Sequence, residues 1–134
     1  MGVENNDCVI ATTWDSEAMQ KVKDWIGTLN GKEQSLFAFI PSLVNNKETL
    51  FMAPCGSNKG WATDAHFEDL RNQLIELLGT LDNEDRSNPF EWVEVSYGDF
   101  GQKVVRGNCL NKYGDEHTNA DIADIWHEMM KLYT

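Results

Sequence analysis

The glycine-punctuated loop of residues 55–61, CGSNKGW, is a segment of this sequence that could bind a ligand. It joins a predicted strand to a predicted helix, and backbone amides in that setting often bind phosphate. Lys59 adds a positive charge, but it precedes the second glycine, so the spacing departs from that of a P-loop. A tight turn is the simpler interpretation. The residues that would contact a small anion are Gly56, Ser57, Asn58, Lys59 and Gly60.

Acidic and histidine side chains gather near the C-terminus, in residues 115–128. If this segment is helical, Asp121, Asp124 and Glu128 share one face and His127 lies beside them. Such side chains could bind a divalent cation. That face lies opposite an apolar stripe, however, so it should contact water and not ligands from other elements. We therefore expect no metal site, and nothing in the sequence indicates a cofactor.

The common catalytic signatures are missing from the sequence. Neither G-x-S-x-G nor H-E-x-x-H occurs, and Asp99-Phe100-Gly101 lacks the other motifs of a kinase, so it should be a hairpin turn. His66 is expected at the surface. The three cysteines are widely spaced, which is typical of reduced thiols in a cytoplasmic protein. This pattern favours a protein that is not an enzyme. The cysteines are Cys8, Cys55 and Cys109.

Charge is the most unusual property of the chain. Eleven Lys and Arg residues stand against 22 Asp and Glu residues, for a formal net charge of −11. The excess is concentrated in the second half of the sequence. Such a field opposes the approach of nucleic acid or an anionic membrane and attracts basic proteins. We therefore expect a basic protein as partner, and neither nucleic acid nor a membrane.

A cluster of acids with a tryptophan beside it suggests where that partner would dock. In residues 91–97, alternation places Trp92 on the face opposite Val93 and Val95. An aromatic side chain surrounded by polar groups is typical of a binding surface. The alternative for Trp92 is a place under a helix. The residues expected to contact the partner are Trp92, Trp61, Asp82, Glu84, Asp85, Glu91 and Glu94.

Two functions follow from these observations. The first is a small acidic protein-binding module, such as an inhibitor or an immunity protein that docks on a basic nuclease toxin. Electrostatic attraction would speed its encounter with that partner. The alternative is a small enzyme or anion-binding protein that uses the Gly56–Gly60 loop, with Cys55, Asp64 or His66 nearby.

Hydrophobic periodicity predicts the elements that would position these groups. Residues 35–43 and 49–54 are apolar on both faces, so this hairpin should be central and covered. A helix with Thr63 or Asp64 as its N-cap carries a regular leucine stripe. The predicted elements are a strand at 8–14, a helix at 16–29 that ends at Asn30-Gly31, strands at 35–43 and 49–54, a helix from 63 to 81, strands at 91–97 and 102–107, and a helix after Thr118.

The order of these elements, βαββα-ββ-α, predicts a single α+β domain over residues 1–134. We expect an antiparallel sheet with helices, in which the first six elements form a ferredoxin-like sandwich and the final hairpin and helix extend it. No apolar run reaches the roughly 18 residues that span a bilayer. The N-terminus has no secretory signal pattern, so a cytoplasmic location is expected. The sequence predicts no oligomeric state.

Overall fold

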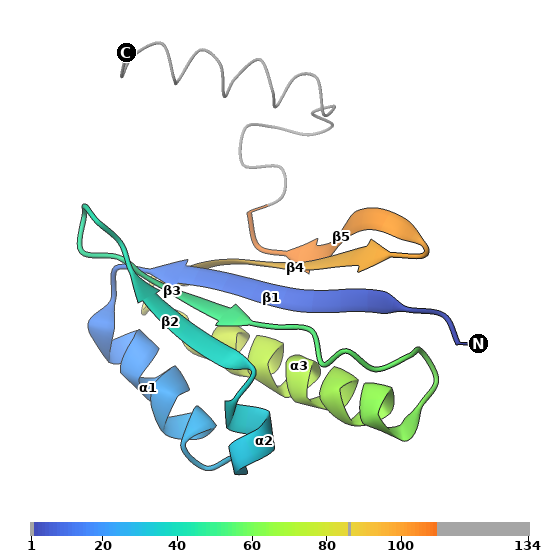
Figure 1. The fold of residues 1–134 in the computed structure, drawn as a ribbon. Coiled ribbons are helices and arrows are strands. Elements are labelled where there is room, and N and C mark those ends of the chain that lie inside the picture. The colour runs from blue at the N-terminus through green and yellow to red at the C-terminus, as the bar shows by residue number, and fades with distance from the viewer. Residues whose placement is uncertain (1, 86, 110–134) are drawn as a thin grey trace, which may run out of the picture.

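A computed structural model describes residues 2–85 and 87–109 of the chain. These residues form eight helices and strands, which are labelled in Figure 1. The helix expected after Thr118 lies outside the described residues. In chain order the elements are β1 (Asn5–Thr13), α1 (Ser16–Ile26), α2 (Gly31–Gln34), β2 (Phe37–Pro41), β3 (Glu48–Met52), α3 (Ala62–Thr80), β4 (Phe90–Gly98) and β5 (Gly101–Gly107).

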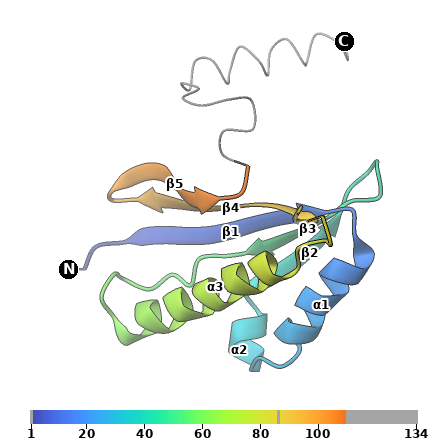
Figure 2. The same cartoon turned by 180° about the vertical axis from the view of Figure 1, so that it is seen from behind.

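The strands form one antiparallel sheet in the order β2-β3-β1-β4-β5. Strand β3 lies between β1 and β2 and runs antiparallel to both, so β1 and β2 are parallel and are joined through α1. This is the split β-α-β connection. Figures 1 and 2 show α1 and α3 on the same face of the sheet. The predicted α+β class with an antiparallel sheet is confirmed.

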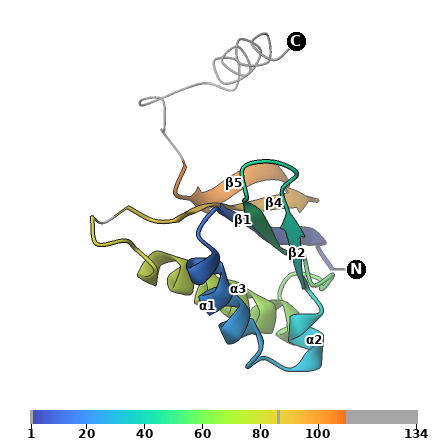
Figure 3. The same cartoon turned by 90° about the vertical axis from the view of Figure 1, so that its left-hand side faces the viewer.

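The core lies between the sheet and the two longer helices, and the end view in Figure 3 shows these helices on one side of the sheet. Strand alternation sends Val9 and Ala11 of β1 towards the helices. The leucine stripe of α3 meets them because residues three and four apart share one helix face. The fully or almost fully buried apolar side chains of this core are Val9, Ala11, Ala18, Met19, Val22, Ile26, Leu50, Met52, Leu70, Leu74, Leu78 and Phe90.

Two predicted helix boundaries were wrong, because each cap lies elsewhere. Helix α1 ends at Ile26, and Asn30 starts a helix where a stop was predicted. The Asn30 side chain accepts from the Glu33 amide at 2.9 Å, and the Glu33 carboxylate accepts from the Asn30 amide at 3.0 Å, which is a capping box. Helix α3 begins after Trp61, which makes no side-chain cap, so Asp64 lies within its first turn.

The expectation that the first hairpin is central and covered was wrong for β2. This strand is at the edge of the sheet, because β1 pairs with β3 and β4 and leaves β2 only one neighbour. Ile40 points away from the helices and is 59% exposed. Strand β2 therefore has apolar residues on both faces, although the described elements do not cover both of its sides.

The second hairpin is confirmed, with Asp99 and Phe100 in its turn between β4 and β5. Gly98 has a φ of +142°, and a Cβ there would lie 2.8 Å from the Glu4 carbonyl oxygen. No larger residue fits that approach without a backbone shift. A bulge between Glu94 and Val95 shifts the register, so Arg106 pairs with Glu94 while Val104 pairs with Val95. Arg106 thus shares the helix-facing side with Glu94.

All three cysteines are thiols. Cys8 is buried in β1, and burial raises the pKa of its thiol, to which the Asp7 charge adds. Cys55 is partly buried in the loop before α3, and Cys109 is exposed. Of the described helices, none has both the length and the apolar character that a membrane crossing requires.

Candidate functional site

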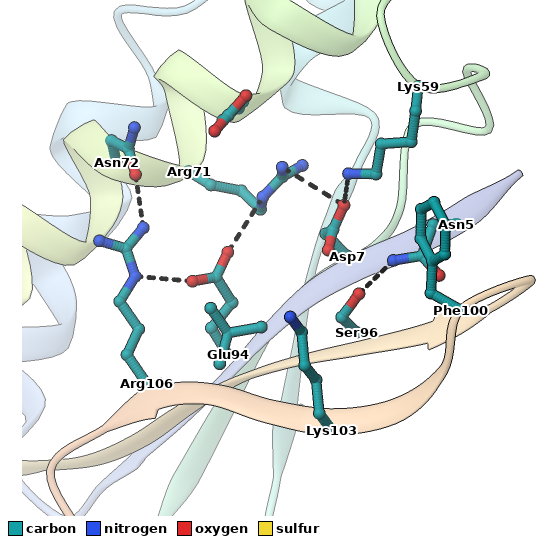
Figure 4. A pocket seen from close by; sticks show the side chains of 12 residues that line it. Asn5, Asp7, Lys59, Arg71, Asn72, Glu94, Ser96, Phe100, Lys103 and Arg106 are labelled. Carbon is teal, nitrogen blue, oxygen red and sulfur yellow. Dashed lines mark hydrogen bonds and ion pairs between the residues drawn. The ribbon is translucent and has the colours of Figure 1, made fainter. Parts of the chain in front are cut away.

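A pocket of about 460 Å³ lies between α3 and strands β1, β4 and β5 (Figure 4). Its volume falls within the range of small-molecule sites. Two helices packed side by side, about 10 Å apart, together cover roughly four strands spaced about 4.8 Å. In a five-stranded sheet this leaves space beneath the outer part of the sheet. The lining residues are Asn5, Asp7, Lys59, Glu68, Arg71, Asn72, Glu94, Ser96, Phe100, Lys103, Val105 and Arg106.

Arg71 is the buried centre of this pocket. It lies beside the leucine stripe of α3, so the helix directs it towards the sheet, and its side chain is only 5% exposed. Its Nε donates to Glu94 Oε2 at 3.3 Å, and its Nη2 lies 3.6 Å from Asp7 Oδ2. Both carboxylates sit on the helix-facing side of their strands. The alternation of β1 and β4 therefore supplies two buried partners for the guanidinium.

The ion pairs continue outward from Arg71 in both directions (Figure 4). Glu94 Oε1 accepts from Arg106 Nε at 2.6 Å, and Arg106 Nη2 donates to Asn72 Oδ1. On the other side Asp7 accepts from the Lys59 ammonium, which also lies 3.6 Å from Asp64. Cations and acids thus alternate across the pocket. This pairing compensates the burial of Asp7 and Glu94, which would otherwise be costly.

The pKa shifts keep both ends of the Asp7–Lys59 pair charged. Burial acts to raise the pKa of Asp7, but hydrogen bonds from Lys59 and Ser96 and the charge of Arg71 outweigh it, so this pKa lies below its usual value. Burial acts to lower the pKa of Lys59, and the bond to Asp7 reverses the shift, so that pKa is raised. Neither group titrates near neutral pH, which suits binding better than proton transfer.

Several hydrogen-bonding groups of the pocket have no partner within the described part of the chain. The Lys103 side chain forms neither an ion pair nor a hydrogen bond there, and Figure 4 shows its ammonium directed between Glu94 and Ser96. Of the five N–H groups of Arg71, only that of Nε donates a hydrogen bond among these residues. Asn5 Oδ1 is buried without a hydrogen-bond partner. The pocket therefore has unused capacity to bind polar groups.

The seven residues predicted to contact a basic partner do not lie together. Trp92 packs against the core, under the helices, and Glu94 is buried in the ion-pair network. Glu91 points away from the helices, and Trp61, which is 57% exposed, precedes α3. The remaining three follow the other end of α3, about 28 Å along the helix axis. They are Asp82, Glu84 and Asp85.

Of the predicted anion loop, only Lys59 lines the pocket. The backbone of the loop is held against the N-terminal segment, because the Lys59 amide donates to the Val3 carbonyl at 2.8 Å. The Gly60 amide donates to Asp64 Oδ2 at 3.1 Å, so the chain's own carboxylate takes a position that an anion could occupy. The cationic side chains of the pocket thus come from three separate segments, and only one of these was predicted.

Sequence reasoning missed Asp7, Arg71, Lys103 and Arg106. One signal was available: Arg71 follows Leu70 on the apolar stripe of α3, where a charged residue needs a buried partner. The identity of that partner depends on strand pairing. His66, expected at the surface, is exposed and pairs with Glu33 at 2.9 Å.

Metal-binding geometry does not occur in the described ranges 2–85 and 87–109, where no three His, Cys, Asp or Glu residues are grouped to bind an ion. The acidic set considered for a metal site lies outside the described residues. It consists of Asp121, Asp124, His127 and Glu128.

No family model matches the chain, and no curated protein or solved structure matches it. Its function is therefore inferred from its own geometry.

Proposed function

We propose that the protein binds a small anionic ligand, bearing a carboxylate or phosphate group, in the pocket between α3 and strands β1, β4 and β5. The observation that carries this proposal is the meeting of four cationic side chains in a chain whose net charge is −11. Three acidic side chains line the same pocket, so its local charge balance is reversed relative to the chain. The four cations are Lys59, Arg71, Lys103 and Arg106.

The hydrogen-bonding state of these cations supports an anion in preference to a neutral ligand. Lys103 has no acceptor among the described residues, and most N–H groups of Arg71 donate no hydrogen bond there. A planar guanidinium and an ammonium together suit a carboxylate or a phosphate, which accepts several hydrogen bonds at once. Phe100 and Val105 add apolar contacts at the edge of the pocket. A small ligand with an anionic group and an apolar part fits this lining.

This function can be tested by titrating the ¹⁵N-labelled protein with inorganic phosphate and, separately, with succinate, a dicarboxylate. We expect amide shifts at Lys59, Arg71 and Lys103 for at least one of the two. A hydrogen bond to a charged group contributes about 1.5–3 kcal/mol. Lys103→Ala should therefore weaken binding about tenfold or more.

Lys21→Ala is the matched control, because it removes the same charge from an exposed position on α1, away from the pocket. It should leave the affinity within about twofold. If the two substitutions weakened the affinity equally, anion binding would depend only on the net charge of the protein. Shifts spread over the whole surface, or no shifts with either anion, would reject this pocket as a site for these groups.

We also propose a second candidate, docking of a basic protein near the C-terminal end of α3, which the position of Trp14 supports. Trp14 is 68% exposed and shares a small pocket with Asn88, Pro89 and Glu91. Asn88 donates to Asp82 at 2.9 Å, which connects this tryptophan to the acidic loop of Asp82, Glu84 and Asp85. An exposed aromatic next to acids is a typical interface anchor.

The acidic loop is also braced by its own hydrogen bonds. Asp85 Oδ1 accepts from the Ser87 amide at 3.0 Å and from the Ser87 hydroxyl at 2.6 Å, and these bonds lower the pKa of Asp85. The Asn83 amide donates to the Ser87 carbonyl at 2.7 Å. Ordering of the loop before binding reduces the entropy that docking must overcome. Trp14 would take the place of the anchor that the sequence assigned to Trp92 or Trp61.

For this second candidate, basic proteins that the chain captures from its native host at low salt would be identified and their binding rates measured. Reversing Glu84 and Asp85 to Lys should slow association and flatten its salt dependence, while Trp14→Ala should mainly speed dissociation. Trp61→Ala, at the other end of α3, is the control and should change neither rate. If neither the charge reversal nor Trp14→Ala changes the association or dissociation rate of a partner, that partner docks elsewhere.

A further inference from the structure

The sheet has a second face, which we call the open face, on the side away from α1 and α3. The strand registers align apolar side chains there in two neighbouring rows. Phe51 pairs with Ile10, which pairs with Val93, and next to this row Cys8 pairs with Val95, which pairs with Val104. Figures 1 and 2 show no described helix on this side of the sheet.

The open face is more apolar than contact with water alone would explain. Ile10 is 36% exposed, Val104 is 50% exposed and Ile40, on β2, is 59% exposed. An antiparallel sheet that faces water usually presents polar residues on that side. A continuous apolar patch on a protein surface usually marks an interface. The open face therefore requires a cover that the described residues do not supply.

We propose that residues 118–134 form a helix whose apolar stripe packs on the open face. The sequence predicts an amphipathic helix there, with Asp121, Asp124 and Glu128 on its opposite side. Such a stripe needs an apolar partner, and the open face is an apolar surface without one. The stripe consists of Ile122, Ile125, Trp126, Met129, Leu132 and Tyr133.

The last described residues direct the chain towards this face. Asn108 continues the pairing at the end of β5, where its side chain accepts from the Trp92 amide at 2.9 Å and donates to the Phe90 carbonyl at 2.7 Å. The next residue, Cys109, has its Sγ 3.9 Å from Glu91 Oε2. Glu91 pairs with Thr12 and, like Val93, points away from the helices. The described chain therefore ends next to Glu91, on the open-face side of β4.

The lengths agree with this placement. Residues 110–117, fully extended, reach about 28 Å at most. A helix over residues 118–134 is about 25 Å long. A nine-residue strand such as β1 extends about 30 Å, and five strands extend about 19 Å across. The helix can thus cross both apolar rows without leaving the sheet.

Charge and attachment both favour this segment over a second copy of the chain. Two copies that met through their open faces would repel each other, because each carries a net charge of −11. A tethered segment instead acts at a millimolar effective concentration. In the proposed arrangement the acids of residues 118–134 point to solvent, and the apolar stripe meets a face whose two central rows contain no charged residue.

The test uses methyl-labelled full-length protein and nuclear Overhauser effects. We expect contacts from the Trp126 indole ring to the methyl groups of Ile10, Val95 or Val104. A second spectrum, recorded on a mixture of labelled and unlabelled chains, detects only contacts between molecules. It therefore distinguishes contacts within one chain from contacts between two copies. Contacts that appear only between molecules would assign the open face to a second copy and overturn the proposal.

A soluble paramagnetic probe provides a second readout. In the unaltered chain the probe should increase the relaxation rates of the Ile10 and Val95 methyl groups only slightly. In the Ile125→Asp variant this increase should be several-fold larger. Asp124→Asn, next to it on the opposite side of the predicted helix, is the control and should change nothing. Strong relaxation of these methyl groups in the unaltered chain, with no contact to Trp126, would show that the open face is bare.

Discussion

Arg71→Leu is expected to lower the free energy of unfolding by about 3–5 kcal/mol at neutral pH. The substitution keeps the apolar part of the side chain but leaves Asp7 and Glu94 buried without their shared cation. Removal of one partner from a buried ion pair is strongly destabilising, because the remaining charge is poorly solvated. Urea denaturation of the variant and the unaltered chain measures the difference.

The same experiment at lower pH tests whether charge is the cause. Asp7 has its pKa lowered from the model-peptide value of 3.8. It therefore contributes stability above that value, and this contribution is lost as the pH falls through its lower folded value. Without Arg71 the pKa of Asp7 should rise. The difference between the two proteins should then shrink as the pH falls below about 4, where the carboxylate begins to protonate.

Arg106→Leu is the control, since it removes a guanidinium from the outer end of the same network. Its side chain is 42% exposed, and Glu94 would keep its ion pair with Arg71, so Arg106→Leu should cost less than Arg71→Leu. If Arg71→Leu cost no more than Arg106→Leu, or if its cost did not change with pH, the buried network would not be a major source of stability.

Leu74→Ala should cost about 2–5 kcal/mol of unfolding free energy. Leu74 is completely buried at the centre of α3, between the helix and the sheet. The substitution removes apolar contacts and leaves a cavity that the surrounding strands and helices can only partly fill. Equilibrium denaturation measures the loss.

Glu76→Ala is the matched control because it lies on the exposed side of the same helix and introduces the same residue. Its effect should stay within about 0.5 kcal/mol, as is usual for surface positions. A loss below that size for Leu74→Ala would contradict the packing of α3 on the sheet.

Local periodicity was sufficient for most of the secondary structure. The leucine stripe of α3 and the alternation of β4 follow from the spacing of apolar residues along a short stretch of chain. The α+β class followed from the order of those elements. Element ends were less predictable, because a cap depends on single hydrogen bonds. Asn30 could end one helix or start the next, and its bond with Glu33 decided between them.

Only the tertiary structure decided which face of each strand is covered. Alternation assigned Trp92 and Val93 to opposite faces, but the pattern is the same whichever face meets the helices. Strand pairing then placed Trp92 against the core and Val93 on the open face. For the same reason the sequence could not show that β2 lies at the sheet edge.

The charged pocket also depended on tertiary structure. Asp7, Arg71 and Glu94 lie far apart in the sequence, and each by itself is typical of a surface residue. They meet because β1 pairs with β4 and α3 packs across both strands, which buries two carboxylates next to one guanidinium. The net charge of −11 followed from composition alone. The burial of Arg71 between two carboxylates did not, because ion pairing depends on distance in space.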